Sequence, residues 1–377
     1  MRNSGWRGLI GVALALAAMA LPVAAQTYKA EYSLSIVPDA GTPWGKGTQL
    51  WADMVRERTH GRINIKLHPG ATLVGGDQTR EFSALRQGVI DIAVGSTINW
   101  SSAIPEFNVF SLPFLLRGYR SLDALTHGDV GRELFLRVQE QGVVPLAWGE
   151  NGFRQLTNSR RPIRTPEDMR GLRFRVVGSL LFNDIFTALG AYPTQMTWNE
   201  AIRALRARKI DGQENPMTIY NNVRLDTVGQ RYVTVWDYVA DPIVFVVNRQ
   251  VWDSWTPQDR DIVREAAVEA ARFEVTLARE DLLSSGRAMW DDLEARGVRV
   301  TRLTPDQRQR FVDATRPVYA KWKALVGREL VEKAEAAVRG DGKADVKASD
   351  VKGDVKPDTK AGVTSAAKPR ATVSAQK

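Results

Sequence analysis

The 377-residue sequence contains no cysteine and only three histidines. The absence of cysteine excludes disulfide bonds, thiolate catalysis and cysteine-ligated metals. The histidines, His60, His68 and His127, are scattered, and two of them stand at the ends of predicted elements. We therefore interpret them as surface residues rather than as a metal site. A chain of this length does not need disulfides to fold, so the missing cysteines do not argue against export.

Several catalytic and cofactor-binding motifs are also missing. There is no Gly-x-Ser-x-Gly elbow, no His-Glu-x-x-His pair and no dinucleotide-binding fingerprint. The stretch GTPWGKGT (41–48) resembles a phosphate-binding loop, but that motif needs four residues between its glycines and Ser or Thr directly after its lysine. Here three residues separate Gly41 from Gly45, and Gly47 follows Lys46. We expect no cofactor and no metal, and nothing in the sequence indicates an enzyme.

Only one long apolar run occurs, from about Leu9 to Leu21, preceded by Arg2 and Arg7 and followed by the small residues of VAA (23–25). This pattern is typical of a Sec-type signal peptide. The alternative is a membrane anchor, but the run is shorter than the ~20 residues that a spanning helix needs. We therefore expect residues 1–25 to direct export, and the mature chain to be a soluble periplasmic protein.

The formal net charge of +9 is spread unevenly along the chain. The signal peptide carries two arginines, and the tail from Asp341 onward carries eight basic and five acidic residues, so about +4 remains for the folded body. That balance is too small to indicate nucleic-acid binding, and it is compatible with an anionic small molecule. The tail, residues 340–377, repeats the string DVK and lacks aromatics, which predicts disorder.

The rest of the chain alternates strand-like and helix-like segments. In the first part, strands are predicted at 28–38, 63–69, 90–95 and 143–150, and helices at 42–61 and 79–88. In the second part, a short helix is predicted at 162–171, a strand at 171–177, helices at 180–190 and 197–209, and a strand at 232–236. This alternation predicts an α/β fold, with a largely parallel sheet in the first part, wrapped by helices.

Two later segments predict that the chain crosses between two lobes. The strand 241–252 could return to the first lobe, and the helical pattern 256–297 would span about 60 Å if straight. We expect that helix to bend or to bridge the lobes; a strand near 298–303 and a helix at 304–327 follow. The expected lobe I comprises 26–151 plus about 240–280, and lobe II comprises 152–239 plus about 281–325. A ligand site between the lobes is the default expectation, and such folds open and close about a hinge.

The stretch GLRFRVV (171–177) poses a specific question. Leu172, Phe174 and Val176 alternate onto one face of a strand, and Arg173 and Arg175 share the other face with Val177. If that face meets solvent, the arginines are ordinary surface residues. If it meets a cleft, an arginine there is a fixed cation that can bind an anion.

Four stretches carry a resemblance to a known family: NVFSLPFLLRGY, NGFRQLTNSRRPIRTPEDMRGLRFRVV, ALGAYPTQMTWNEAIRALRARKIDGQENP and VVNRQVW. Together they resemble the DctP-type substrate-binding proteins of TRAP (tripartite ATP-independent periplasmic) transporters, over about residues 28–325. The resemblance implies a two-lobed periplasmic-binding-protein-like fold with mixed sheets and no catalytic turnover. It also implies an organic acid as ligand and two membrane partners, a small and a large integral subunit of a permease.

The same resemblance assigns roles to residues of the second lobe. Arg175 matches the arginine that forms a bidentate salt bridge with the substrate carboxylate, and Arg173 matches a solvent-facing or paired position. Arg154 matches a supporting carboxylate contact, with a surface ion pair as the alternative. Asn215 matches an asparagine that hydrogen-bonds the substrate, with a turn before Pro216 as the alternative.

The remaining candidate residues are less specific. Trp198 matches an aromatic residue that packs on the ligand, or else caps the start of a helix. Gln213 belongs to the QENP motif and is a further candidate, with a structural role for its side chain as the alternative. In the first lobe the match is looser, and the candidates there are Asp39, Trp44, Asp77, Ser96, Thr97 and Asn99. Because sialic-acid binders of the family carry glutamate where Ser96 stands, sialic acid is disfavoured.

The sequence thus predicts a monomeric extracytoplasmic receptor that captures an organic acid. C4-dicarboxylates, 2-oxo acids, sugar acids and aromatic acids all supply the carboxylate that Arg175 requires. Two other classes stay open: a ligand sensor that serves a signalling receptor, and a periplasmic enzyme that acts on a carboxylate.

Overall fold

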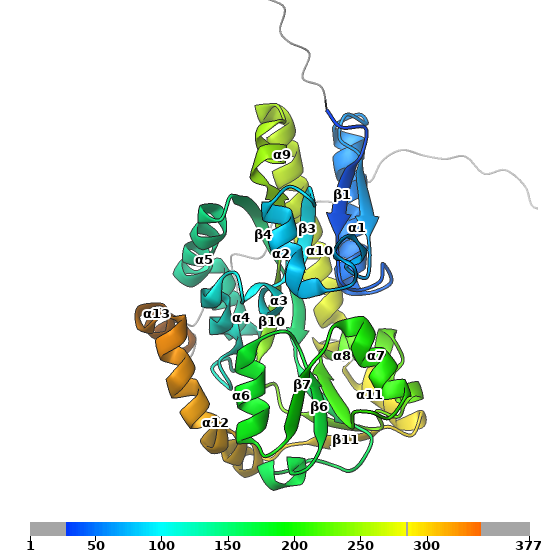
Figure 1. Ribbon diagram of the computed structural model, residues 1–377, viewed down its shortest axis with the longest axis vertical. Helices are drawn as coiled ribbons and strands as arrows, with labels where there is room; N and C mark the ends of the chain where they lie inside the picture. The colour runs from blue at the N-terminus through cyan, green and yellow to red at the C-terminus, as the bar shows by residue number, and fades with distance from the viewer. Residues whose placement is uncertain (1–27, 284–285, 341–377) are drawn as a thin grey trace, which may run out of the picture. The chain divides into compact units, whose positions relative to one another are not determined.

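The computed structural model describes residues 28–283 and 286–340 (Figure 1). The predicted signal peptide and the predicted tail beyond Gly340 lie outside these residues. None of the helices in the two described ranges has the length and apolar character needed to span a bilayer.

The described strands are β1 (Tyr32–Ser35), β2 (Ile65–His68), β3 (Ile92–Ser96), β4 (Val143–Phe153), β5 (Gln155–Asn158), β6 (Arg173–Val176), β7 (Tyr192–Gln195), β8 (Gly212–Asn215), β9 (Tyr232–Val235), β10 (Ala240–Asn248) and β11 (Arg299–Arg302). The α-helices are α1 (Pro43–Arg58), α2 (Glu81–Arg86), α3 (Thr97–Trp100), α4 (Tyr119–His127), α5 (Asp129–Glu140), α6 (Leu180–Ala188), α7 (Trp198–Arg206), α8 (Met217–Asn222), α9 (Arg249–Asp253), α10 (Pro257–Leu283), α11 (Gly286–Ala295), α12 (Pro305–Val326) and α13 (Arg328–Gly340). Short 3₁₀ helices are η1 (Thr72–Val74), η2 (Gln78–Arg80), η3 (Pro105–Ser111), η4 (Pro166–Met169) and η5 (Leu225–Val228).

The strands form two mixed sheets, as predicted. The first has the order β2-β1-β3-β10-β4, with β1 parallel to β2 and β3, and with β10 antiparallel to β3 and β4. The second has the order β11-β9-β5-β8-β6-β7, with β6 parallel to β7 and β8, and with β5 antiparallel to β8 and β9. The expectation of a largely parallel first sheet holds only for β1, β2 and β3, because β10 enters this sheet from the other one without a crossover helix.

Two connections between strands join the sheets (Figure 1). The end of β4 continues into β5, and β9 is followed by β10, which lies in the first sheet. The predicted strand 241–252 is shorter than expected, since the Asn248 side chain accepts the N–H groups of Gln250 and Val251 and starts α9. The predicted helix 256–297 is described as α10, which packs against α1 and β4, and α11, which packs against β11.

Local capping explains most of the predicted helices. Thr42 accepts the Gly45 N–H at the start of α1, and Pro43 takes the first helical position. The predicted Thr197–Glu200 capping box is present at the start of α7. The predicted helix 162–171 is only the 3₁₀ turn η4, whereas α4, α5 and α13 were not predicted.

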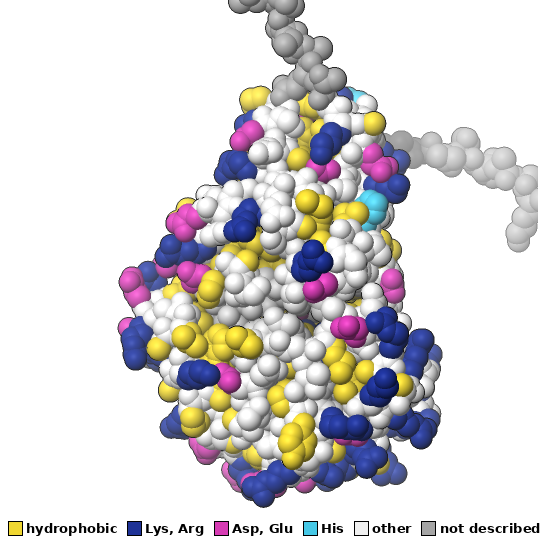
Figure 2. Space-filling view, viewed as in Figure 1, with side chains coloured by type: hydrophobic (Ala, Val, Ile, Leu, Met, Phe, Trp, Pro, Cys, Tyr) yellow, Lys and Arg dark blue, Asp and Glu magenta, His cyan; other side chains and the backbone are white. Residues whose placement is uncertain are grey.

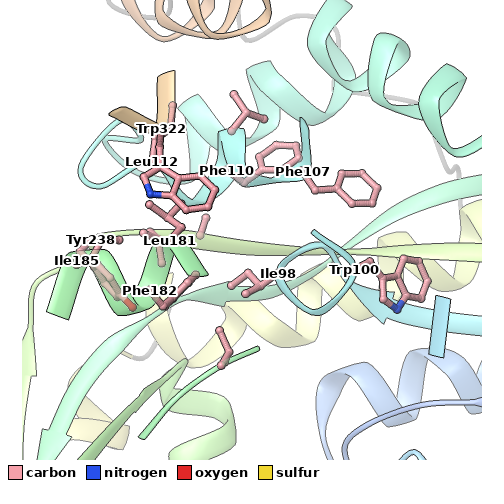
Figure 3. Packing of buried hydrophobic residues seen from close by; sticks show 14 of the residues in the cluster. Ile98, Trp100, Phe107, Phe110, Leu112, Leu181, Phe182, Ile185, Tyr238 and Trp322 are labelled. Carbon is pink, nitrogen blue, oxygen red and sulfur yellow. The ribbon is translucent and has the colours of Figure 1, made fainter. Parts of the chain in front are cut away.

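One continuous apolar core links the two sheets. It contains residues of the first sheet, such as Val244 and Val246, and of the second, such as Phe174. Figure 3 shows where its parts meet: Ile98 and Trp100 of α3, Phe107 and Phe110 of η3, Leu181, Phe182 and Ile185 of α6, Tyr238 ahead of β10, and Trp322 of α12. One apolar cluster therefore holds residues of both sheets together.

Candidate functional site

A cavity of about 100 Å³ lies between elements of the two sheets. Since a buried water needs about 10–15 Å³ of comparable volume, the space holds several waters or one small organic acid. Its lining comprises Val37, Pro38, Asp39, Thr42, Trp44, Gly70, Gln78, Ser96, Asn99, Asn151, Arg154, Arg175, Val177, Trp198, Asn199, Asn215, Ile219, Val223 and Asp241. The strands β3, β6 and β8 all reach it with their carboxyl ends, the usual place for a ligand in such sheets.

Eight of the eleven residues that the sequence predicted for the site line this cavity: Arg175, Arg154, Asn215, Trp198, Trp44, Ser96, Asp39 and Asn99. The other three, Asp77, Gln213 and Thr97, are not among the described lining residues.

Arg175 is a buried cation without a carboxylate partner. It lies on β6 with 2% of its surface exposed. Its Nε donates to the carbonyl oxygen of Met196 at 3.1 Å, and its guanidinium lies 5.8 Å from the centre of the Trp198 ring. In the described part of the chain, no carboxylate oxygen comes within 4.0 Å of it. Burial lowers the pKa of Arg175 to about 10; the charge of Glu214 opposes this shift and that of Arg154 adds to it. The group therefore stays charged at neutral pH and can bind an anion.

Arg154, in contrast, already has two carboxylate partners. It is fully buried, and its Nε and Nη2 donate to the carboxylate of Glu214, while Nη1 donates to Asp241 at 3.1 Å. Tyr238 donates to Glu214 at 2.8 Å. The charge of Arg154 is thus compensated within the protein. The alternative of a surface ion pair for Arg154 is wrong, because both carboxylates are buried with it.

Asp241 is held by three donors. Besides Arg154, the Ser96 hydroxyl donates to it at 2.6 Å and the Asn151 amide at 2.8 Å. Burial raises the pKa of Asp241, and Arg154 opposes this shift. Ser96, predicted to contact the ligand, therefore also connects β3 to β10 and caps α3.

Two amides are arranged to meet a polar ligand. The Asn215 side chain donates to Gln213 Oε1 at 2.5 Å, and Gln213 in turn donates to the Thr157 hydroxyl at 2.8 Å. Gln213 therefore orients Asn215 rather than lining the cavity itself. Asn99 presents a buried Oδ1 without a hydrogen-bond partner among the described residues, so it offers an acceptor to a ligand hydroxyl.

The two tryptophans present mainly ring surface to the cavity. The Trp44 indole N–H donates to the Val94 carbonyl oxygen at 3.1 Å. The backbone N–H of Trp198 donates to Gln78 Oε1 at 3.3 Å, which joins η2 of one side to α7 of the other. Asp77, predicted to contact the ligand, instead accepts the N–H and hydroxyl of Thr79 and caps η2.

The two arginines of GLRFRVV have different surroundings. Arg173 is half-exposed and pairs with Asp211 at 3.2 Å, which confirms its prediction as a paired residue. Arg175, two residues later, points to the cavity at the other end of the strand. The short strand separates them by position along its length, since both side chains lie on the same face.

Eleven lining residues were not predicted, among them the polar residues Gln78, Asn151, Asn199 and Asp241. Asn151 and Asp241 had a detectable signal, because each is a polar residue within a buried, mostly apolar strand. Gln78 and Asn199 stand at helix starts, where a polar residue has an ordinary structural explanation.

Comparison with solved structures shows close similarity over most of the chain. A TRAP periplasmic solute binding protein from Ralstonia eutropha, with bound (S)-2-hydroxy-2-methyl-3-oxobutanoate ((S)-2-acetolactate), is 57% identical with a TM-score of 0.82, covering 83% of this chain and 100% of that one. A TRAP periplasmic solute binding protein from Sulfurospirillum deleyianum, with bound succinate, is 27% identical with a TM-score of 0.76, covering 81% and 98%.

Curated relatives agree with this similarity. The C4-dicarboxylate-binding periplasmic protein DctP of Rhodobacter capsulatus is 26% identical over 87% of this chain and 96% of its own length. The 2,3-diketo-L-gulonate-binding periplasmic protein YiaO of Escherichia coli is 31% identical over 70% of this chain and 77% of its own length. The resemblance drawn from the four sequence stretches is thus confirmed. Because the family model for bacterial extracellular solute-binding proteins, family 7 (DctP), matches residues 34–325, this chain belongs to that family.

Proposed function

We propose that this protein captures a small monocarboxylic acid that carries a hydroxyl or oxo group next to its carboxylate, and delivers it to a TRAP permease. The observation that carries the proposal is Arg175, a buried cation that lines a cavity and has no carboxylate partner. A planar guanidinium binds a carboxylate through two parallel hydrogen bonds, and these strengthen where water is excluded.

The charges around the cavity favour one carboxylate rather than two. The two buried carboxylates near the arginines, Glu214 and Asp241, are both hydrogen-bonded to Arg154, so among the described arginines of the lining only Arg175 has no carboxylate partner. A second ligand carboxylate would have to approach a lining that holds Asp39 and Asp241 and would find no further arginine without a carboxylate partner.

Three further features favour a small polar acid. The cavity holds about 100 Å³, and Asn215 and Asn99 offer hydrogen-bonding groups beside the cation. The relative from Ralstonia eutropha, 57% identical, has (S)-2-acetolactate bound, which is a monocarboxylate with both a hydroxyl and an oxo group. Succinate is the second candidate, because a 27% identical structure contains it.

Capture would proceed by closure of two lobes about the segments that cross between the sheets. We keep the predicted boundaries, with lobe I at 26–151 plus about 240–280 and lobe II at 152–239 plus about 281–325. The contact of Gln78 with Trp198 joins the two sides beside the cavity and would form on closure. The closed form would be the one that the two integral permease subunits recognise.

The proposed location is the periplasm, reached through the signal peptide predicted at 1–25.

Members of this family bind solutes, so we set aside the alternative of a periplasmic enzyme. The alternative of a ligand sensor for a signalling receptor would use the same capture step.

The test is thermal unfolding of the mature chain with (S)-2-acetolactate, pyruvate, succinate and acetate. A ligand at a hundred times its Kd adds about 2.7 kcal/mol of stability. We expect the largest shift with acetolactate and little with succinate. If no acid shifts Tm, even after unfolding and refolding to remove trapped ligand, the proposal is wrong.

A further inference from the structure

Many basic residues lie at one edge of the second sheet, where the strand register brings the ends of several strands together. Asn158 pairs with Gly212 and with Tyr232, and Tyr232 pairs with Arg299, so one end of each of these strands meets the same edge. Ten exposed basic residues lie on this edge or in the segments that flank it, and we call them the basic edge: Arg160, Arg161, Arg164, Arg170, Arg173, Arg206, Arg208, Lys209, Arg231 and Arg299.

Hydrogen bonds to backbone carbonyl oxygens link six of these residues in three pairs. Arg173 donates to the carbonyl oxygen of Arg208 at 3.2 Å, and Arg161 donates to that of Arg170 at 2.9 Å. The backbone N–H of Arg299 donates to the carbonyl oxygen of Arg231 at 2.7 Å. Figure 2 shows Lys and Arg side chains gathered over the lower end of the molecule, where Figure 1 places β11 and the ends of β6 and β7.

Most of this charge is uncompensated. Within the basic edge, only Arg160 and Arg173 have a carboxylate within 4.0 Å among the described residues, and both use Asp211. Nearby, Asp168 is occupied with the backbone N–H groups of Arg164 and Thr165. Eight like charges held on one edge repel one another, and an external anionic surface would remove that repulsion.

The substrate site does not explain the basic edge. Arg175 and Asn215 lie toward the opposite ends of β6 and β8, at the cavity. The basic residues stand where β5 ends and where β6, β8, β9 and β11 begin. The modest charge of the whole folded body, about +4, also means that acidic residues are concentrated elsewhere, so the basic edge is a local feature.

An exposed aromatic residue lies at the same edge. Tyr192 pairs with Arg173 in the register of β6 and β7, and 66% of its surface is exposed. Tyrosine favours the headgroup level of a bilayer because its ring is amphipathic. Arginine binds phosphate through two parallel hydrogen bonds. An exposed tyrosine among arginines thus matches a surface of lipid phosphates better than it matches solvent.

We propose that the basic edge docks this protein onto an anionic phospholipid bilayer, with Tyr192 at the headgroup level. Docking by this edge would leave the cavity, at the other end of the same strands, turned away from the lipid. It would keep the receptor near its membrane while it captures solute. The attraction is electrostatic, so it weakens as salt rises.

The test measures partitioning of the full-length mature chain onto vesicles by co-sedimentation. The vesicles contain equal parts phosphatidylcholine and phosphatidylglycerol, or phosphatidylcholine alone. The test variant carries Arg164→Gln, Arg206→Gln and Lys209→Gln. Their side chains make no hydrogen bond or ion pair to described residues, so the fold should be kept. The control variant carries Arg86→Gln, Arg120→Gln and Arg272→Gln, which remove the same net charge from exposed sites outside the basic edge.

Each basic residue near an anionic surface strengthens partitioning about fivefold. We therefore expect the test variant to bind anionic vesicles on the order of a hundredfold more weakly, and the control variant to bind nearly as the wild type does. Binding to neutral vesicles should be absent for all three chains. Equal losses in both variants would show that net charge alone acts, and no binding of the wild type to anionic vesicles would point to an acidic protein partner instead; either result overturns the proposal. Unchanged thermal shifts with acetolactate in the test variant keep this question separate from ligand capture.

Discussion

A buried glutamate on α2 makes the stability of this protein depend on pH in a specific way. Glu81, on α2, is fully buried, and the Ser35 hydroxyl donates to its Oε1 at 2.5 Å. Its Oε2 has no partner among the described residues. Burial raises the pKa of Glu81 from 4.5 to about 8, the hydrogen bond from Ser35 opposes that shift, and the charge of Asp77 adds to it. Glu81 is therefore protonated in the folded protein at neutral pH.

The sign of the effect follows from this raised pKa. Between pH 4.5 and about 8, the folded state keeps a proton on Glu81 that the unfolded state releases. The free energy of unfolding therefore falls as pH rises through this range, by about 1.4 kcal/mol per pH unit. Over the whole range the loss is about 5 kcal/mol.

The variant Glu81→Gln removes this titration. It keeps the shape of the side chain, but it leaves a buried amide with incomplete hydrogen bonding, which costs about 1–3 kcal/mol at every pH. We expect the variant to be less stable than the wild type near pH 5 and more stable near pH 8.5. Urea unfolding at both pH values measures the difference. Because the variant and the wild type share every other buried acid, the pH dependence that those acids cause cancels when the two free energies of unfolding are compared. A difference between variant and wild type that does not change with pH would refute the reasoning.

Two more predictions concern stability. Arg154→Met should lower the free energy of unfolding by about 3–5 kcal/mol at pH 7, because it leaves two buried carboxylates unpaired. Urea unfolding should show a smaller loss at pH 5 than at pH 7. Equal losses at both pH values would contradict this prediction. Gly95→Ala should cost about 1–3 kcal/mol or more by thermal unfolding, since a Cβ there would lie 1.8 Å from a ring carbon of Trp100. Gly340→Ala, where a Cβ meets open space, serves as its control and should leave Tm unchanged.

The sequence predicted those helices whose ends are encoded locally. Thr42 and Thr197 cap α1 and α7 with their own side chains. The helices α4 and α5 were missed because both begin at glycines, Gly118 and Gly128, that make no side-chain cap. The strands β7 and β8, YPTQ and GQEN, lack alternation, and they exist because neighbouring strands supply their hydrogen bonds. A single segment does not contain that information.

The functional site also contains some residues that the sequence predicts and others whose roles appear only in the folded chain. Arg175 and Arg154 stand in stretches that resemble the family, so both could be named. The role of Gln213 depends on Thr157, on a strand more than fifty residues away. Arg154, between β4 and β5, pairs with Asp241 on β10, and only the folded chain shows that this arginine has carboxylate partners while Arg175 has none.

The most direct test of the account compares Arg175→Gln with Arg173→Gln by calorimetric titration of (S)-2-acetolactate. The two substitutions are chemically identical and lie two residues apart on β6, but only Arg175 lines the cavity. Loss of a buried charged partner costs about 2–5 kcal/mol, so Kd should rise roughly thirtyfold to several thousandfold for Arg175→Gln. Arg173→Gln should bind as the wild type does. Tight binding retained in Arg175→Gln, with the wild type binding normally, would contradict the account.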